Sequence, residues 1–121
     1  MIDREDIVAV AERIARAFAP ERIILFSSYA YGAPTEDSDV DLLVVLPFEG
    51  NHTHKAIEIR RCIKAPFSMD LLARTPEQVR WRVEQGDFFL REIMQKGEVL
   101  YESSHDRVDN QGGRRSRVGS A

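Results

Sequence analysis

Apolar residues recur at helical spacing in four segments of the chain. In the first segment one face carries Ile7, Val10, Ile14, Ala17 and Phe18. Asp3 can cap this helix and Pro20 ends it. Three more helices are predicted, bounded by capping residues, proline or glycine, over 54–64, from Thr75 to Gly86, and from Asp87 to Gly97.

Short continuous apolar runs lie between the predicted helices. The runs 23–26 and 40–46 are typical of strands covered on both faces, and 67–73 predicts a third strand after Pro66. The segment 99–101 predicts a last strand or an extended end. Helices that alternate with strands predict an α/β (α+β) fold, with a small mixed β-sheet flanked by helices.

The composition changes near Ser103. From there to Ala121 the chain is mainly Ser, Gly, Arg, Asp and Asn, which bury too little apolar surface to offset the entropy of ordering. We therefore predict one domain over 1–102 and a disordered tail over 103–121. The tail carries four Arg against two Asp, so a weak basic arm for a partner or nucleic acid is the alternative interpretation.

Composition narrows the class of protein. The 121 residues are 43% hydrophobic and 31% charged, as in a soluble globular domain, and no apolar run reaches the roughly 18–20 residues that span a bilayer. The acidic N-terminus does not resemble a secretory signal, and the single Cys62 fits a reducing compartment. We expect a cytoplasmic protein without membrane association. A net charge of -3 gives no case for direct nucleic-acid binding.

Two carboxylates, Asp39 and Asp41, stand at the start of the second predicted strand. Residues two apart in a strand point to the same face, so both carboxylates project together. Mg²⁺ prefers such hard oxygen ligands, together with substrate phosphates. Surface acids at a strand start are the alternative interpretation of this pair.

Residues before and after Asp39 and Asp41 also favour a site that binds phosphate and a cation. Ser28 follows the first strand, where a hydroxyl and free backbone N–H groups make an anion site, and Gly32 permits a sharp turn. Asp70 lies inside the third apolar run, where a charge is costly unless it is paired or holds a cation. If the strands are neighbours, Asp70 joins Asp39 and Asp41 in one cluster; an acid on a half-exposed strand face is the alternative.

The segment from Ser27 to Asp41, with the later Asp70, resembles the signature of the DNA polymerase β nucleotidyltransferase superfamily. That signature is Gly-Ser, about ten residues, Asp-x-Asp on a strand, and a third acid on a later strand. The length and the Ser-x-Ala-x-Gly turn are similar to the minimal nucleotidyltransferases. The resemblance covers about residues 5–102. It departs from the family pattern at Ser27, which stands where the signature has glycine, and at Tyr29 and Tyr31, which stand where many minimal members carry Arg near the turn.

The resemblance implies a nucleotidyltransferase fold and a two-metal Mg²⁺ mechanism with ATP as donor. It places Asp39, Asp41 and Asp70 at the metals, and Ser27, Ser28 and Gly32 at the nucleotide phosphates. It also implies transfer of AMP to an acceptor hydroxyl on a separate helical HEPN-domain toxin, with this chain as antitoxin. Two alternatives stay open: a weak or inactive module that neutralises a partner by binding, as the Ser27 departure suggests, and nucleotidylation of a small molecule.

Two further groups of residues are assigned to structure. We predict that Trp81, Phe88 and Phe89 belong to the core, with an exposed docking patch as the alternative. His52 and His54 are interpreted as exposed loop residues, because no third ligand lies at zinc-like spacing.

Overall fold

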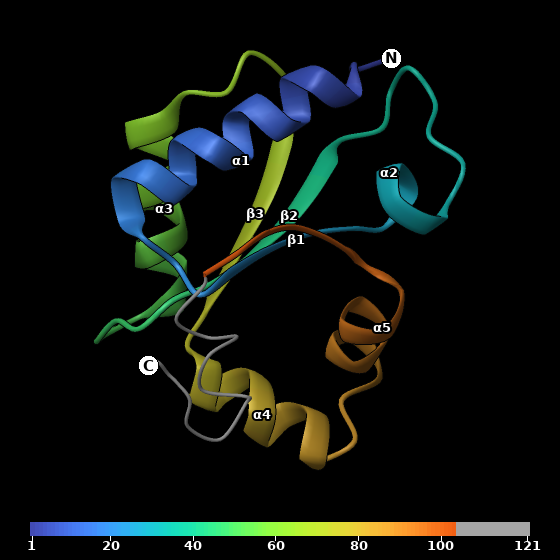
Figure 1. Cartoon of the computed structure of the whole chain (residues 1–121). Coiled ribbons are helices and arrows are strands. Elements are labelled where there is room, and N and C mark those ends of the chain that lie inside the picture. The colour runs from blue at the N-terminus through green and yellow to red at the C-terminus, as the bar shows by residue number, and fades with distance from the viewer. Residues whose placement is uncertain (104–121) are drawn as a thin grey trace, which may run out of the picture.

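The computed structural model describes residues 1–103, which contain five helices and four strands (Figure 1). In chain order they are α1 (Arg4–Phe18), β1 (Arg22–Phe26), α2 (Ser28–Tyr31), β2 (Val40–Val45), α3 (His52–Ile63), β3 (Met69–Arg74), α4 (Pro76–Glu84), α5 (Phe88–Lys96) and β4 (Glu98–Glu102). The predicted tail lies outside the described residues from position 104 onward.

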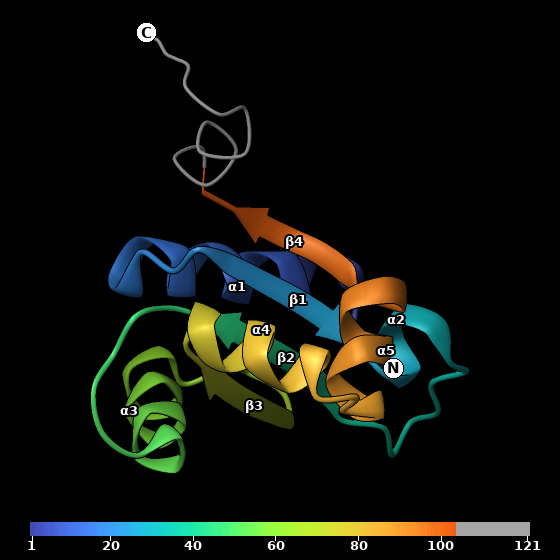
Figure 2. The same cartoon turned by 90° about the horizontal axis from the view of Figure 1, so that it is seen from below.

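The four strands form one mixed sheet in the order β3-β2-β1-β4. β1 is antiparallel to both of its neighbours, whereas β2 and β3 are parallel and are connected through α3. Figure 2 shows β4 and β3 at the two edges of the sheet. This arrangement confirms the predicted α/β class with a small mixed sheet flanked by helices.

Alternate strand residues face two separate cores. α1 and α3 pack on one face, where strand residues such as Leu42, Val44 and Leu71 are buried. α4 and α5 pack on the other face, against Leu43 and Val45 among others. Figure 1 shows these two helical layers on opposite sides of the sheet. None of the helices over residues 1–103 combines the length and apolar character needed to cross a bilayer.

Side-chain caps explain where α3 and α4 begin, whereas the predicted cap residue Asp3 precedes α1 without a side-chain cap hydrogen bond. Asn51 accepts hydrogen bonds from the backbone N–H groups of Thr53 and His54, at 2.7 and 3.1 Å, so α3 begins at His52 rather than at the predicted residue 54. Thr75 and Gln78 form a capping box at the start of α4.

The prediction that three aromatic residues belong to the core was wrong. Trp81, Phe88 and Phe89 are 60%, 81% and 52% exposed. Phe89 still contacts the core through an edge-to-face packing with Phe26, whose ring centroid lies 5.7 Å away. α4 and α5 are short and bury few residues, chiefly Val79, Leu90 and Ile93, so their remaining apolar side chains face solvent.

Candidate functional site

The turn after β1 holds Ser27 in an unusual backbone conformation. Its φ is 65° and its ψ is -142°, a region populated almost only by glycine. This conformation lets the Ser27 carbonyl accept hydrogen bonds from the backbone N–H groups of Ala30 and Tyr31, both at 2.9 Å, which starts α2. The turn therefore has the geometry that a glycine would adopt, although a serine occupies it.

Gly32 is required at the end of α2 by close packing. A Cβ atom on Gly32 would lie 2.9 Å from the Cα atom of Ser28, closer than real Cβ contacts. The chain thus folds back tightly over the first residue of α2. Ser28 itself is half-buried, and Figure 1 shows α2 beside the end of β1 and the start of β2.

The start of the parallel strand pair β2–β3 brings two of the predicted carboxylates together. Asp41 and Asp70 are direct partners in the register of β2 and β3, and neighbouring strands lie about 4.8 Å apart. Both side chains therefore project from the same face of the sheet, the face covered further along by α4 and α5. Asp39 precedes β2 by one residue and is exposed.

The pKa of Asp41 is raised above its ordinary value. Burial is the main cause, and the neighbouring negative charges of Asp70 and, more weakly, Asp39 add to it. The side chain of Ser27 opposes this shift by donating a hydrogen bond to the Asp41 carboxylate. Ser27 makes no side-chain cap bond to α2.

The negative charge of these carboxylates suits a cation, but their side chains are not arranged as a complete metal-binding site. Over residues 1–103, no group of three or more His, Cys, Asp or Glu side chains is placed to hold a metal ion. The raised pKa of Asp41, caused by burial and by adjacent negative charges, is nevertheless the perturbation that a bound divalent cation would relieve. The metal role of Asp39, Asp41 and Asp70 stays a prediction.

Asp70 is exposed, contrary to the expectation that its strand is covered by the core. β3 is an edge strand, and the helices on this face pack over β1 and β2 rather than over its start. The half-exposed-face interpretation of Asp70 was therefore the better description of its burial. Its position beside Asp41 agrees with the predicted neighbourhood.

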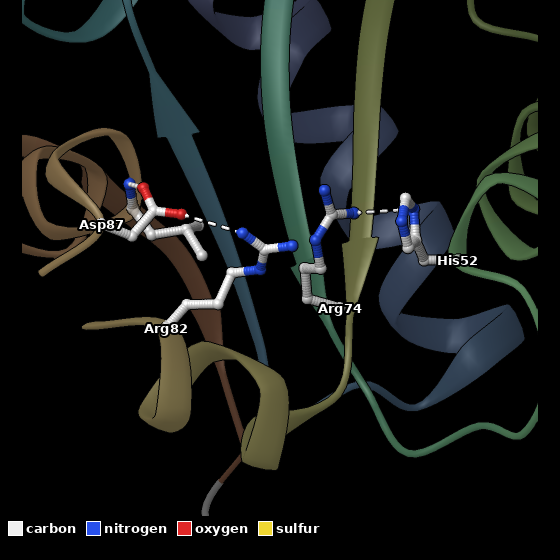
Figure 3. Close-up of polar contacts among 5 residues, drawn as sticks. His52, Arg74, Arg82 and Asp87 are labelled. Carbon is white, nitrogen blue, oxygen red and sulfur yellow. Dashed lines mark hydrogen bonds and ion pairs between the residues drawn. The ribbon is translucent and has the colours of Figure 1, made fainter. Parts of the chain in front are cut away.

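The sequence analysis missed a cluster of basic residues on the same face. Arg74 ends β3, and its Nη1 lies 3.1 Å from Nδ1 of His52. Arg82 of α4 forms an ion pair with Asp87 at 3.4 Å (Figure 3). Arg74 follows Asp70 at a spacing of four, so strand periodicity alone could have placed both on one face.

Comparison with known proteins identifies the family. The family model described as Polymerase beta, Nucleotidyltransferase matches residues 9–106. The chain belongs to the polymerase beta nucleotidyltransferase family. No curated protein sequence matches significantly.

Solved structures support the nucleotidyltransferase fold. A protein of Sulfolobus solfataricus assigned as a nucleotidyltransferase shares 18% identity at a TM-score of 0.57, over 81% of this chain and 78% of its own. A toxin–antitoxin structure with AMP-PNP shares 18% identity at a TM-score of 0.53, over 82% of this chain and 76% of its own. A mutant of the toxin–antitoxin MntA-HpeT shares 16% identity at a TM-score of 0.50, with 82% and 76% covered.

Proposed function

We propose that this nucleotidyltransferase transfers AMP from ATP to an acceptor hydroxyl on a partner protein, a helical HEPN-domain toxin, and so acts as its antitoxin in the cytoplasm. The observation that carries the proposal is the register of β2 and β3, which pairs Asp41 with Asp70 beside the glycine-like turn at Ser27. The toxin–antitoxin structures with this fold, one of them with AMP-PNP, support a partner protein and a nucleotide donor.

Each residue has a distinct part in this proposal. Ser28 and backbone N–H groups of the turn would bind the triphosphate, because a hydroxyl and N–H groups at the start of a helical turn suit an anion. Asp39, Asp41 and Asp70 would hold Mg²⁺, which when bound activates the attacking hydroxyl and neutralises the phosphates. The exposed Asp70 lies on the open edge of the site and is the carboxylate best placed to accept the hydroxyl proton.

A labelling experiment tests the transfer. The purified chain, the candidate toxin, Mg²⁺ and ATP labelled on the α-phosphate are incubated together, and the label on the toxin is measured. We expect Asp70→Asn to abolish labelling while ATP still binds, and the exposed Asp37→Asn to label normally. Unchanged labelling by Asp70→Asn would refute the assignment.

The second candidate function is neutralisation by binding alone. The Cβ atom of Ser27 occupies the position at which a glycine would let the triphosphate approach the backbone. A tight complex with the toxin that forms without ATP and carries no label would favour this function over transfer.

A further inference from the structure

A cationic cavity lies on the face of the sheet that carries the carboxylates, at the opposite end of β3. It has a volume of about 230 Å³ and is lined by His52, Arg74, Gln78, Trp81 and Arg82. We refer to it as the arginine pocket. Figure 3 shows Arg74 rising from β3 and Arg82 from α4, with both guanidinium groups extending along this face.

The arginine pocket is separate from the site at Asp41. Asp70 and Arg74 are four residues apart on one strand, which places their Cα atoms about 13 Å from each other. Leu72 lies between them on the same face and is half-buried. A ligand group in the pocket would therefore be bound beyond the carboxylates, on the β3 side and away from Ser28.

Positive charge in the arginine pocket is not balanced. Arg82 is paired with Asp87, one of whose oxygens also accepts a 3.0 Å hydrogen bond from the backbone N–H of Leu90. No carboxylate within residues 1–103 lies at ion-pair distance from Arg74. Burial lowers the pKa of the Arg74 guanidinium, and the nearby Arg82 cation lowers it further. Two cations thus share one anion.

His52 adds a third donor to the two guanidinium groups. An arginine N–H can only donate, so Nδ1 of His52 accepts from Arg74, and the imidazole proton lies on Nε2. Arg74 also donates to the carbonyl of its own neighbour Ala73, at 2.8 Å, which fixes its direction. The guanidinium is held in place and keeps further N–H groups for a ligand.

We propose that the arginine pocket binds a phosphate group. A carboxylate has two oxygens, which one guanidinium fork satisfies, whereas a phosphate presents enough oxygens to accept from two forks at once. Its negative charge also offsets the positive charge that Asp87 leaves unbalanced in the pocket. The phosphate belongs either to the bound nucleotide or to a second, phosphorylated ligand. The proposal does not depend on the transfer reaction.

Trp81 provides a local signal for the test. It is the only tryptophan of the chain, and it lines the pocket. Inorganic phosphate is titrated against the full chain while the tryptophan fluorescence is followed, with NaCl at equal ionic strength as the control. We expect a saturable change with phosphate and none with NaCl.

Variants test whether the fluorescence change comes from phosphate bound in the arginine pocket. Arg82→Gln and Arg74→Gln should each weaken phosphate binding about tenfold or more. Arg80→Gln is the matched control, because Arg80 lies on the same helix but outside the pocket. Asp87→Asn should tighten binding several-fold, since asparagine still caps α5 but no longer competes for Arg82. This gain cannot be produced by misfolding.

The same titration identifies the source of the phosphate. If saturating ATP displaces inorganic phosphate, the group belongs to the nucleotide; if both bind together, it belongs to a second ligand. Asp70→Asn should leave phosphate binding intact, so a failed transfer reaction is distinguished from an empty pocket. The proposal is refuted if phosphate gives no saturable change, or if Arg74→Gln and Arg82→Gln bind it like Arg80→Gln.

Discussion

Ser27 makes two opposing contributions to stability, which two substitutions can separate. Its backbone is strained because a residue with a Cβ adopts φ 65° and ψ -142°, whereas its hydroxyl stabilises Asp41 by a hydrogen bond. Ser27→Ala removes the hydroxyl and keeps the strain. Ser27→Gly removes both.

The magnitudes follow from these two contributions. Backbone strain in such a region costs about 1–3 kcal/mol, and glycine loses about 0.5–1 kcal/mol through its greater freedom in the unfolded chain. The Gly variant should therefore be about 1–2 kcal/mol more stable than the Ala variant. Loss of the hydroxyl bond to a half-buried carboxylate should make Ser27→Ala about 1 kcal/mol less stable than the wild type.

Urea unfolding at pH 7, followed by circular dichroism, measures the three free energies of unfolding. Ser68 supplies the control, since it is exposed and has an ordinary negative φ. At Ser68 the alanine variant should be at least as stable as the glycine variant, which reverses the order expected at Ser27. If Ser27→Ala were as stable as Ser27→Gly, the inferred backbone strain at Ser27 would be refuted.

The same pair of variants should differ in nucleotide binding. Removal of the Cβ atom opens the backbone of the turn to the triphosphate, so Ser27→Gly should bind ATP more tightly than Ser27→Ala. Calorimetric titration with ATP and Mg²⁺ measures both affinities.

Three other substitutions test the site and the scaffold. Asp41→Asn should modestly raise the free energy of unfolding at pH 7, since it removes a carboxylate whose ionised form is disfavoured by burial and by the neighbouring Asp70. Because the pKa of Asp41 is raised in the folded state, ionisation destabilises the wild type, so in acid titrations of stability the gap should narrow as the pH falls through the raised pKa and be lost below the unfolded value of about 3.9. Gly97→Ala should lower the melting temperature and cost about 1–3 kcal/mol, because the new Cβ atom would lie 2.5 Å from Cγ2 of Ile24. Thr75→Ala should cost about 1 kcal/mol in urea unfolding by removing the α4 cap, whereas the exposed Thr53→Ala should have little effect.

Local sequence patterns predicted where the helices and strands lie better than they predicted how these elements are paired and buried. The runs 23–26 and 40–46 became β1 and β2 because continuous apolar residues have two covered faces to fill. The segment 99–101 was ambiguous as a strand, because its side chains are only partly buried and β4 forms through pairing with β1. Strand order and register depend on contacts distant in the sequence, so no local pattern could supply them.

The candidate site was predicted in its residues but not in its environment. The spacing placed Asp39 and Asp41 on one face, the apolar run around Asp70 added that residue, and the resemblance added Ser27. Only the register shows that Asp41 and Asp70 are direct partners, and only the edge position of β3 explains why Asp70 is exposed. The arginine pocket was missed because it joins side chains from three elements.

One face of the sheet carries several locally unfavourable features. Ser27 is strained, the pKa of Asp41 is raised by burial and by like charges, and the pKa of Arg74 is lowered by burial and by Arg82. The opposite face, under α1 and α3, is filled with buried apolar residues. Natural sequences keep locally unfavourable arrangements chiefly where function requires them. Acidic residues lie at one end of this face and arginines at the other. Together they would match a ligand that combines a metal-bound phosphate with a second anionic group. The two ends should therefore be tested separately.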